Sequence, residues 1–272
     1  MKTDLKTNLK AIIARAYVRV IAANREPSWW FSETLLPILS TAAYVYVYKA
    51  LKAPAEYTGF VILGGTMSAY WIQVLWSMAA QFYWEKEVGN LDLYMIAPIS
   101  RMSILLGMAS GGMIQATSRA IFIFLVGSLI FKVSFAVVSL PKILVVFILT
   151  LVSLYGLGML FSSLFMLYGR EAWHGVTLLQ EPVHLISGFY FPVKNLGMVV
   201  GFVASFIPLT LGLDAMRQLA FAAGAKSALV SVNAEIGVLM LLCILFLVSS
   251  KYALELMEKL GKKEGRLTLR WQ

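Results

Sequence analysis

Two long stretches of this chain contain no acidic or basic residue. They run from Tyr57 to Trp84 and from Ile143 to Gly169, which is 28 and 27 residues, whereas a helix needs only about 20 residues to cross the hydrocarbon core of a bilayer. The whole chain is 60% apolar and 14% charged, against about 45–50% and about 25% in soluble domains. The sequence therefore excludes a water-soluble fold and predicts an all-α polytopic membrane protein.

The apolar runs predict six transmembrane helices. They cover residues 28–51, 57–82, 102–131, 140–167, 173–191 and 230–250. A further uncharged run, 195–213, carries Pro208 and several glycines. Interrupted helices are tolerated at membrane depth where protein or a water-filled cavity covers their backbone, so we expect a re-entrant segment between spans five and six. If this run crossed instead, the C-terminal tail would lie outside.

No internal repeat or linker divides the chain, which predicts one transmembrane domain over residues 1–272. We expect an interfacial helix over 1–27, a six-span body over 28–252 and a basic tail over 253–272. Of the 23 Lys and Arg residues, six lie in the first 28 positions and six in the last 22. By the positive-inside rule both termini are predicted to be cytoplasmic, in an inner (plasma) membrane. The net charge of +9 then follows from topology, and we expect no nucleic-acid partner.

The N-terminal segment predicts an amphipathic helix that lies on membrane lipids. Arg15 falls off its apolar stripe and Arg19 near the edge, and the alternative is a solvated basic arm. No cleavable signal peptide is visible, because the charges are spread through the segment. The residues that recur at helical spacing are Leu5, Leu9, Ile12, Ile13, Ala16 and Val20.

Motifs for ATP hydrolysis and for common hydrolases are absent from the sequence. No G-x-x-x-x-G-K-[ST] loop, G-x-S-x-G elbow or H-E-x-x-H pair occurs, so we expect no catalytic residue, bound cofactor or metal in this chain. The single cysteine, Cys243, rules out an intrachain disulfide.

The charged segment 85–101 predicts a short helix that points into the cytoplasm. Val88, Leu91, Met95 and Ile99 fall at helical intervals, which gives an apolar side and a carboxylate-rich side. Such a surface suits docking into a groove of a partner. The alternative is an ordinary solvated loop.

The residues of this segment resemble the cytoplasmic loop of the type 2 ABC transporter permeases. The usual pattern there is an acidic residue, then Gly-Thr-Leu-Glu, then Pro-Ile-Ser. This chain carries Asn90 for Thr and Asp92 for Glu. The matching stretches are Glu85, Gly89-Asn90-Leu91-Asp92, Ala97-Pro98-Ile99-Ser100 and Ile104-Leu105-Leu106-Gly107.

A second stretch is similar to the family's segment between the fifth and sixth spans. In relatives this segment makes re-entrant helices at the outer face, although the usual proline after Asn-Leu is Gly197 here. The residues that we assign to it by resemblance are Gly188, Pro192, Asn195, Pro208, Asp214 and Arg217.

The resemblance implies a half-transporter body that exports an amphipathic small molecule, a lipid or a lipid-linked glycan. Two copies, or this chain and a paralogue, would meet in the membrane above two ABC ATPase subunits, which hold the ATP and Mg. The loop would be the coupling helix seated on the ATPase. Its implied coupling residues are Glu85, Glu87, Gly89, Leu91, Asp92 and Pro98.

Ionisable residues inside the predicted spans suggest function, because they are costly in hydrocarbon. His174, Glu181 and His184 share one face of the fifth span. With Glu33 in the first span, they are predicted to line the translocation path or the subunit interface. Alternatives are internal pairing, for example with Arg119, or metal binding. In a different function class, the three residues of the fifth span would serve a stand-alone membrane enzyme or an ion channel.

Overall fold

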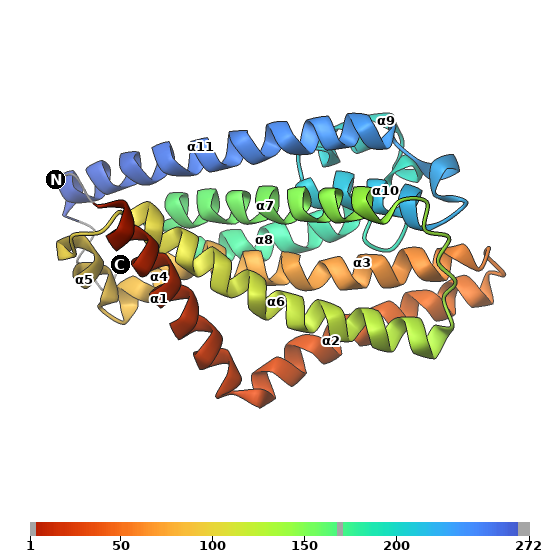
Figure 1. Cartoon of the computed structure of the whole chain (residues 1–272), viewed down its shortest axis with the longest axis horizontal. Coiled ribbons are helices and arrows are strands. Elements are labelled where there is room, and N and C mark those ends of the chain that lie inside the picture. The colour runs from red at the N-terminus through yellow and green to blue at the C-terminus, as the bar shows by residue number, and fades with distance from the viewer. Residues whose placement is uncertain (1–3, 168–170, 266–272) are drawn as a thin grey trace.

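The computed structural model describes residues 4–167 and 171–265, and within these ranges every regular element is a helix, with no strand. The longer helices form an elongated bundle, in which most of them lie roughly along the long axis and α1 crosses it obliquely (Figure 1). Their bounds are α1 Leu5–Asn24, α2 Pro27–Ala50, α3 Glu56–Ile72, α6 Arg101–Phe131, α7 Leu140–Phe165, α8 Glu171–Ile186 and α11 Val232–Glu264. The shorter helices are α4 Gln81–Glu87, α5 Asn90–Ile96, α9 Met198–Ala204 and α10 Pro208–Ala220.

Four helical stretches in the described chain are long and apolar enough to cross a membrane. They are Glu56–Glu87, Arg101–Phe131, Leu140–Phe165 and Val232–Glu264, and the bent pair α9–α10 makes five if it is one broken span. The predicted count of six is therefore not confirmed. The two predicted spans outside this set are α2, which is 24 residues long but carries Glu33 and several polar residues, and α8, which is only 16 residues long.

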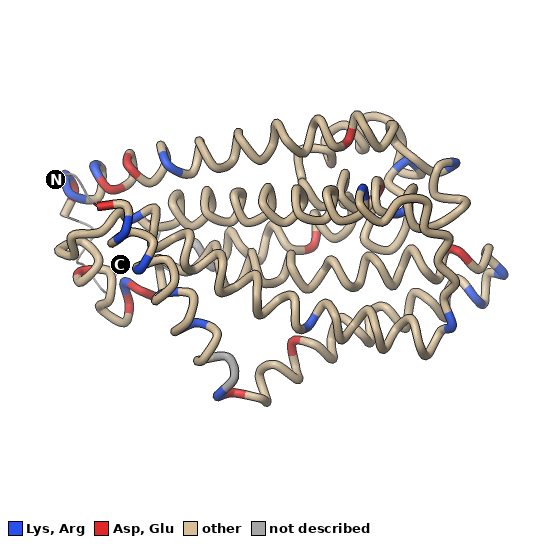
Figure 2. Tube along the Cα trace, in the orientation of Figure 1, with Lys and Arg blue, Asp and Glu red and all other residues tan. Residues whose placement is uncertain are grey.

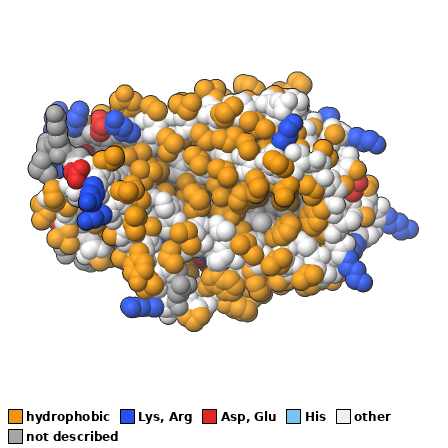
Figure 3. Space-filling view, in the orientation of Figure 1, with side chains coloured by type: hydrophobic (Ala, Val, Ile, Leu, Met, Phe, Trp, Pro, Cys, Tyr) orange, Lys and Arg blue, Asp and Glu red, His pale blue; other side chains and the backbone are white. Residues whose placement is uncertain are grey.

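Charged residues gather at the two ends of the bundle, and the middle is almost free of them (Figure 2). The face seen in Figure 3 is correspondingly covered by hydrophobic side chains between two charged ends. Large apolar side chains are exposed on the long helices, among them Leu129 on α6 and Leu241 on α11. An outward-facing apolar band is the surface expected of a helical bundle that sits in lipid.

Helix α3 is the centre of the bundle. It contacts α2, α6 and α10, and Phe60, Val61 and Ile62 are fully buried. It runs on through a π-helical segment, Gln73–Ala79, into α4. The π-helix is a rare geometry that is found mainly at functional sites.

Gly64 on α3 is predicted to be irreplaceable. A Cβ at this position would lie 1.5 Å from the carbonyl oxygen of Phe189, so Gly64→Ala forces the 187–192 turn away from α3. We expect severe loss of folded protein, measured as monodisperse material after detergent extraction. Gly237→Ala on α11 is the matched control, since nothing lies within 4 Å of its Cβ and alanine favours a helix by about 1 kcal/mol. Equal yields of the two variants would contradict this packing.

The N-terminal segment is a helix, as predicted, but its apolar stripe is divided, since Ile12, Ala16 and Val20 are partly buried and the rest is exposed. α1 meets α2 in a sharp elbow (Figure 1) and packs across α6. Its contact face includes Arg15, Ala16 and Arg19, which lie against Gly107 and Gly111 of α6. Leu5, Leu9 and Ile13 of the predicted stripe are exposed. The amphipathic assignment is therefore not confirmed, and lipid contact of the exposed stripe stays a prediction.

The segment predicted to be re-entrant is a broken helix. α9 and α10 are bent by 113° relative to one another, and the break comes directly before Pro208, the first residue of α10. Proline suits a first helical position because its missing N–H is not needed there. Residues 168–170, between the fourth and fifth predicted spans, and the end of the basic tail, residues 266–272, lie outside the described residues.

Candidate functional site

Glu85 is the centre of a buried polar cluster at the end of the bundle that carries the N-terminus. Its carboxylate forms an ion pair with Arg15 of α1. It also accepts hydrogen bonds from Gln81 Nε2 at 2.7 Å, Asn90 Nδ2 at 2.9 Å and the Tyr94 hydroxyl at 3.0 Å. We call these five residues the Glu85 cluster. It joins α1, α4 and α5, so one carboxylate fixes three helices.

The Glu85 cluster is withdrawn from solvent. Glu85 is only 5% exposed. Burial lowers the pKa of Arg15 and raises the pKa of Tyr94. The Tyr94 hydroxyl is therefore still protonated at neutral pH and still donates its hydrogen bond. Glu85 was predicted as part of an acidic docking side, but the structure turns it inward, where it positions its neighbours.

The cluster holds a projecting knob, which we define as residues 81–100. Gly89 adopts a left-handed backbone with φ 85°, which lets α5 turn back sharply after α4. Leu91 is buried as the anchor of α5. The outer surface of the knob is apolar, because Val88, Leu93 and Ile96 are exposed by 70%, 59% and 81%.

The other predicted coupling residues lie around this surface. Glu87 and Asp92 are half-buried and Pro98 is exposed. Two further contacts tie the base of the knob to the bundle. The backbone N–H of Ser100 donates to Asn8 of α1 at 2.9 Å, and Arg101 pairs with Glu258 of α11 at 3.2 Å.

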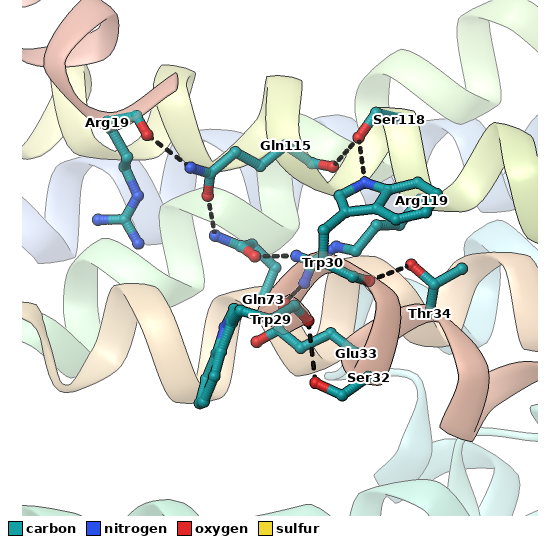
Figure 4. Close-up of polar contacts among 10 residues, drawn as sticks. All are labelled: Arg19, Trp29, Trp30, Ser32, Glu33, Thr34, Gln73, Gln115, Ser118 and Arg119. Carbon is teal, nitrogen blue, oxygen red and sulfur yellow. Dashed lines mark hydrogen bonds and ion pairs between the residues drawn. The ribbon is translucent and has the colours of Figure 1, made fainter. Parts of the chain in front are cut away.

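A second polar group lies inside the bundle beside the α1–α2 elbow (Figure 4). Arg119 of α6, only 4% exposed, pairs with Glu33 of α2 and donates to Gln73 in the π-helix. Gln73 donates to Gln115 at 3.2 Å, and Gln115 donates to the backbone oxygen of Arg19 at 2.7 Å. This Arg119 network borders a cavity of about 240 Å³ that Trp29 and Trp30 also line.

Glu33 was predicted to share a site with the ionisable residues of the fifth span, but the structure separates them. Glu33 lines the cavity beside the elbow, whereas Glu181 and His184 line a different hollow. His174 is exposed on α8 and lines neither of them. Within the described ranges no three His, Cys, Asp or Glu side chains are placed to hold a metal ion. Of the four residues predicted to act together, the structure thus places Glu181 and His184 at one hollow and Glu33 at another.

The hollow that Glu181 and His184 share is a groove of about 490 Å³ between α2, α3, α8 and the turn after α8. We call it the α8 groove. Gln180 donates to Glu181 at 3.1 Å and accepts from Trp76 Nε1 at 2.6 Å. The rings of Tyr44 and Tyr190 stack at its wall with centroids 4.0 Å apart.

The residues assigned to the re-entrant segment build the opposite end of the bundle. Arg217 of α10 is buried and donates to the backbone oxygens of Phe60, Phe189 and Phe191 at 3.0, 2.9 and 3.3 Å. Asp214, also buried, accepts from the backbone N–H of Leu229 at 2.8 Å. These two side chains tie α10 to α3, to the turn after α8 and to the segment before α11.

The remaining residues of this segment shape its turns. Gly188 has a φ of 71° and packs where a Cβ would meet Val193 at 2.3 Å. Pro192 is buried, and Asn195 is exposed next to Lys194.

Several residues that complete these polar groups were not predicted from the sequence. Arg15, Gln73 and Gln115 were not singled out as site residues, yet each completes a polar group described above. Gln73 and Gln115 are polar residues in long apolar runs, which is the signal that would have identified them.

Comparison with known proteins finds a matching family model and curated relatives. The sequence model of the ABC-2 type transporter family matches residues 7–221. Two curated relatives are named "Probable multidrug ABC transporter permease YbhR", one from Escherichia coli strain K12 and one from Escherichia coli O157:H7. Each is 29% identical over 135 residues, which is 50% of this chain and 36% of the relative's own length. No solved structure matches the chain.

Proposed function

The chain belongs to the ABC-2 type transporter family, and we propose that it is the membrane subunit of an ATP-driven exporter. A separate ABC ATPase, in two copies, would bind Mg and ATP and supply the energy. The membrane body would be a homodimer or a pair with a paralogue, and both termini would lie in the cytoplasm. The cargo would be an amphipathic molecule that leaves the cytoplasm or the inner leaflet.

The proposal rests on the structure of the knob, residues 81–100. Its apolar tip is exposed, yet its base is held by the Glu85 cluster, by Asn8 and by the Arg101–Glu258 pair. A rigid projection with apolar side chains at its tip suits insertion into a groove on a partner. Motion of the ATPase would pass through it into α1, α6 and α11.

The translocation path is proposed to run along the α8 groove. Arg119 is paired with Glu33, which leaves Glu181 facing the groove with no ion pair in the described chain. Exposed apolar residues flank the groove, including Leu36 and Leu185. A second subunit placed against this face would enclose the groove.

The knob's role predicts that Ile96→Asp uncouples the transporter. Ile96 is 81% exposed at the tip, so the change leaves the fold intact and places a charge in the docking contact. Desolvating that charge would cost several kcal/mol, and we expect at least a tenfold loss of ATPase retention. The measurement is co-purification with the co-expressed ATPase, together with ATP hydrolysis by the complex.

Leu51→Asp is the control for this experiment. Leu51 is 70% exposed in the loop after α2, at the opposite end of the bundle. The proposal predicts wild-type ATPase retention for this variant. Equal behaviour of the two variants, or ATP hydrolysis by the purified chain alone, would refute the proposed function.

A further inference from the structure

The α8 groove has the size and lining of a small-molecule site. Its volume of about 490 Å³ falls within the range of about 300–1,000 Å³ that is typical of such sites. Leu36, Pro37, Ile72 and Leu185 give it apolar walls. Ser40, Ser68 and Gln180 add uncharged polar groups. A ligand that fits here has an apolar body with few polar atoms.

The charge in the groove is negative and uncompensated. Glu181 is the one carboxylate that lines it, and no Lys or Arg does so. The Glu181 carboxylate accepts one hydrogen bond, from Gln180, in the described chain, although a carboxylate can accept about four. His184 is engaged elsewhere, since its ring stacks on Phe189 with centroids 4.8 Å apart and its Nδ1 lies 3.0 Å from the Gln180 oxygen.

The aromatic wall, like Glu181, favours a positively charged ligand. Tyr44 and Tyr190 line the groove and stack on each other, and an aromatic ring attracts a cation that lies over its free face within about 6 Å of its centre. This attraction is larger where water is excluded. In the part of the chain described, no set of three His, Cys, Asp or Glu side chains is placed to hold a metal ion.

We propose that the α8 groove binds lipophilic organic cations, with Glu181 as the counter-charge and Tyr44 and Tyr190 as the aromatic wall. This substrate class rests on the proposed function, because the groove serves transport only if the chain is an exporter subunit. A quaternary phosphonium or ammonium ion with aromatic or aliphatic groups meets all three features. A lipophilic anion of the same shape meets only one, the apolar lining.

The test compares two ions of nearly the same size and opposite charge, tetraphenylphosphonium and tetraphenylborate. Binding is measured by equilibrium dialysis to the full chain in lipid nanodiscs, with empty nanodiscs subtracted. We expect the wild type to bind the phosphonium at least tenfold more tightly than the borate. Glu181→Gln should weaken phosphonium binding at least tenfold, which equals about 1.4 kcal/mol, and Glu181→Asp should retain most of it.

Glu26→Gln is the matched control, because Glu26 lines the cavity beside the elbow and not the α8 groove. It should leave phosphonium binding unchanged. Equal binding of both ions by the wild type, or equal effects of the two glutamine variants, would overturn the proposal. Since no ATPase is needed for these measurements, such a failure is distinguishable from loss of ATPase retention, which tests the transporter role.

Discussion

Replacing Glu85 by alanine is expected to cost about 3–5 kcal/mol of stability, because it leaves the Arg15 guanidinium partly buried without its counter-ion. Asn90 and Tyr94 lose an acceptor in the same step. The knob should then detach from α1, and the variant should fail to retain the ATPase even where it still inserts. Thermal unfolding of the detergent-solubilised protein and co-purification of the ATPase measure the two effects.

A double-mutant cycle measures the interaction energy of the Arg15–Glu85 ion pair. Arg15→Ala and Glu85→Ala should each be strongly destabilising, and the double variant should cost clearly less than their sum, because the two side chains interact directly. Glu87→Ala is the control, a carboxylate two positions away that is half-exposed. If Glu85→Ala lowered the midpoint of thermal unfolding no more than Glu87→Ala does, the Glu85 cluster would not hold the knob.

Neutralising Glu33 is the second change with a large expected effect. Glu33→Gln removes the counter-ion of Arg119, which is buried on α6. An uncompensated cation inside the bundle is expected to cost about 3–5 kcal/mol, seen as a lower midpoint of thermal unfolding and less monodisperse protein. Arg119→Gln added to Glu33→Gln should recover part of this loss.

Glu181→Gln provides the comparison, since it makes the same change at an exposed carboxylate on α8. We expect little effect on thermal unfolding there. If the two glutamine variants lowered the unfolding midpoint equally, the Glu33–Arg119 pair would not stabilise the bundle.

Much of the helical layout was accessible from periodicity and charge. The predicted runs 102–131 and 140–167 begin and end within two residues of α6 and α7. A long apolar segment bounded by charged or turn residues leaves little freedom in where its helix begins and ends. An interrupted helix within 195–213 was also expected from Pro208 and the glycines, whereas the position of the break, directly before Pro208, was not predicted.

Side-chain partners were harder to foresee, because they depend on how helices far apart in sequence are packed. Arg15 lies off the apolar stripe of its helix, and that pattern alone suggests a solvated residue. Gly107 and Gly111 of α6 let α1 approach so closely that the side of α1 that carries Arg15 faces inward. Glu85 then lies opposite Arg15. A single sequence shows the small residues but does not show which helix will come close to them.

Helix α1 touches both polar groups, with Arg15 in the Glu85 cluster and Arg19 beside the Arg119 network. Its 20 residues form a stiff rod of about 30 Å that ends in the elbow. Such a rod acts as a lever. A tilt of the knob would move α1 as one rigid body, so the residues that border the inner cavity would move without any rearrangement of the core between the knob and the cavity. The elbow would be the pivot at which this movement reaches α2.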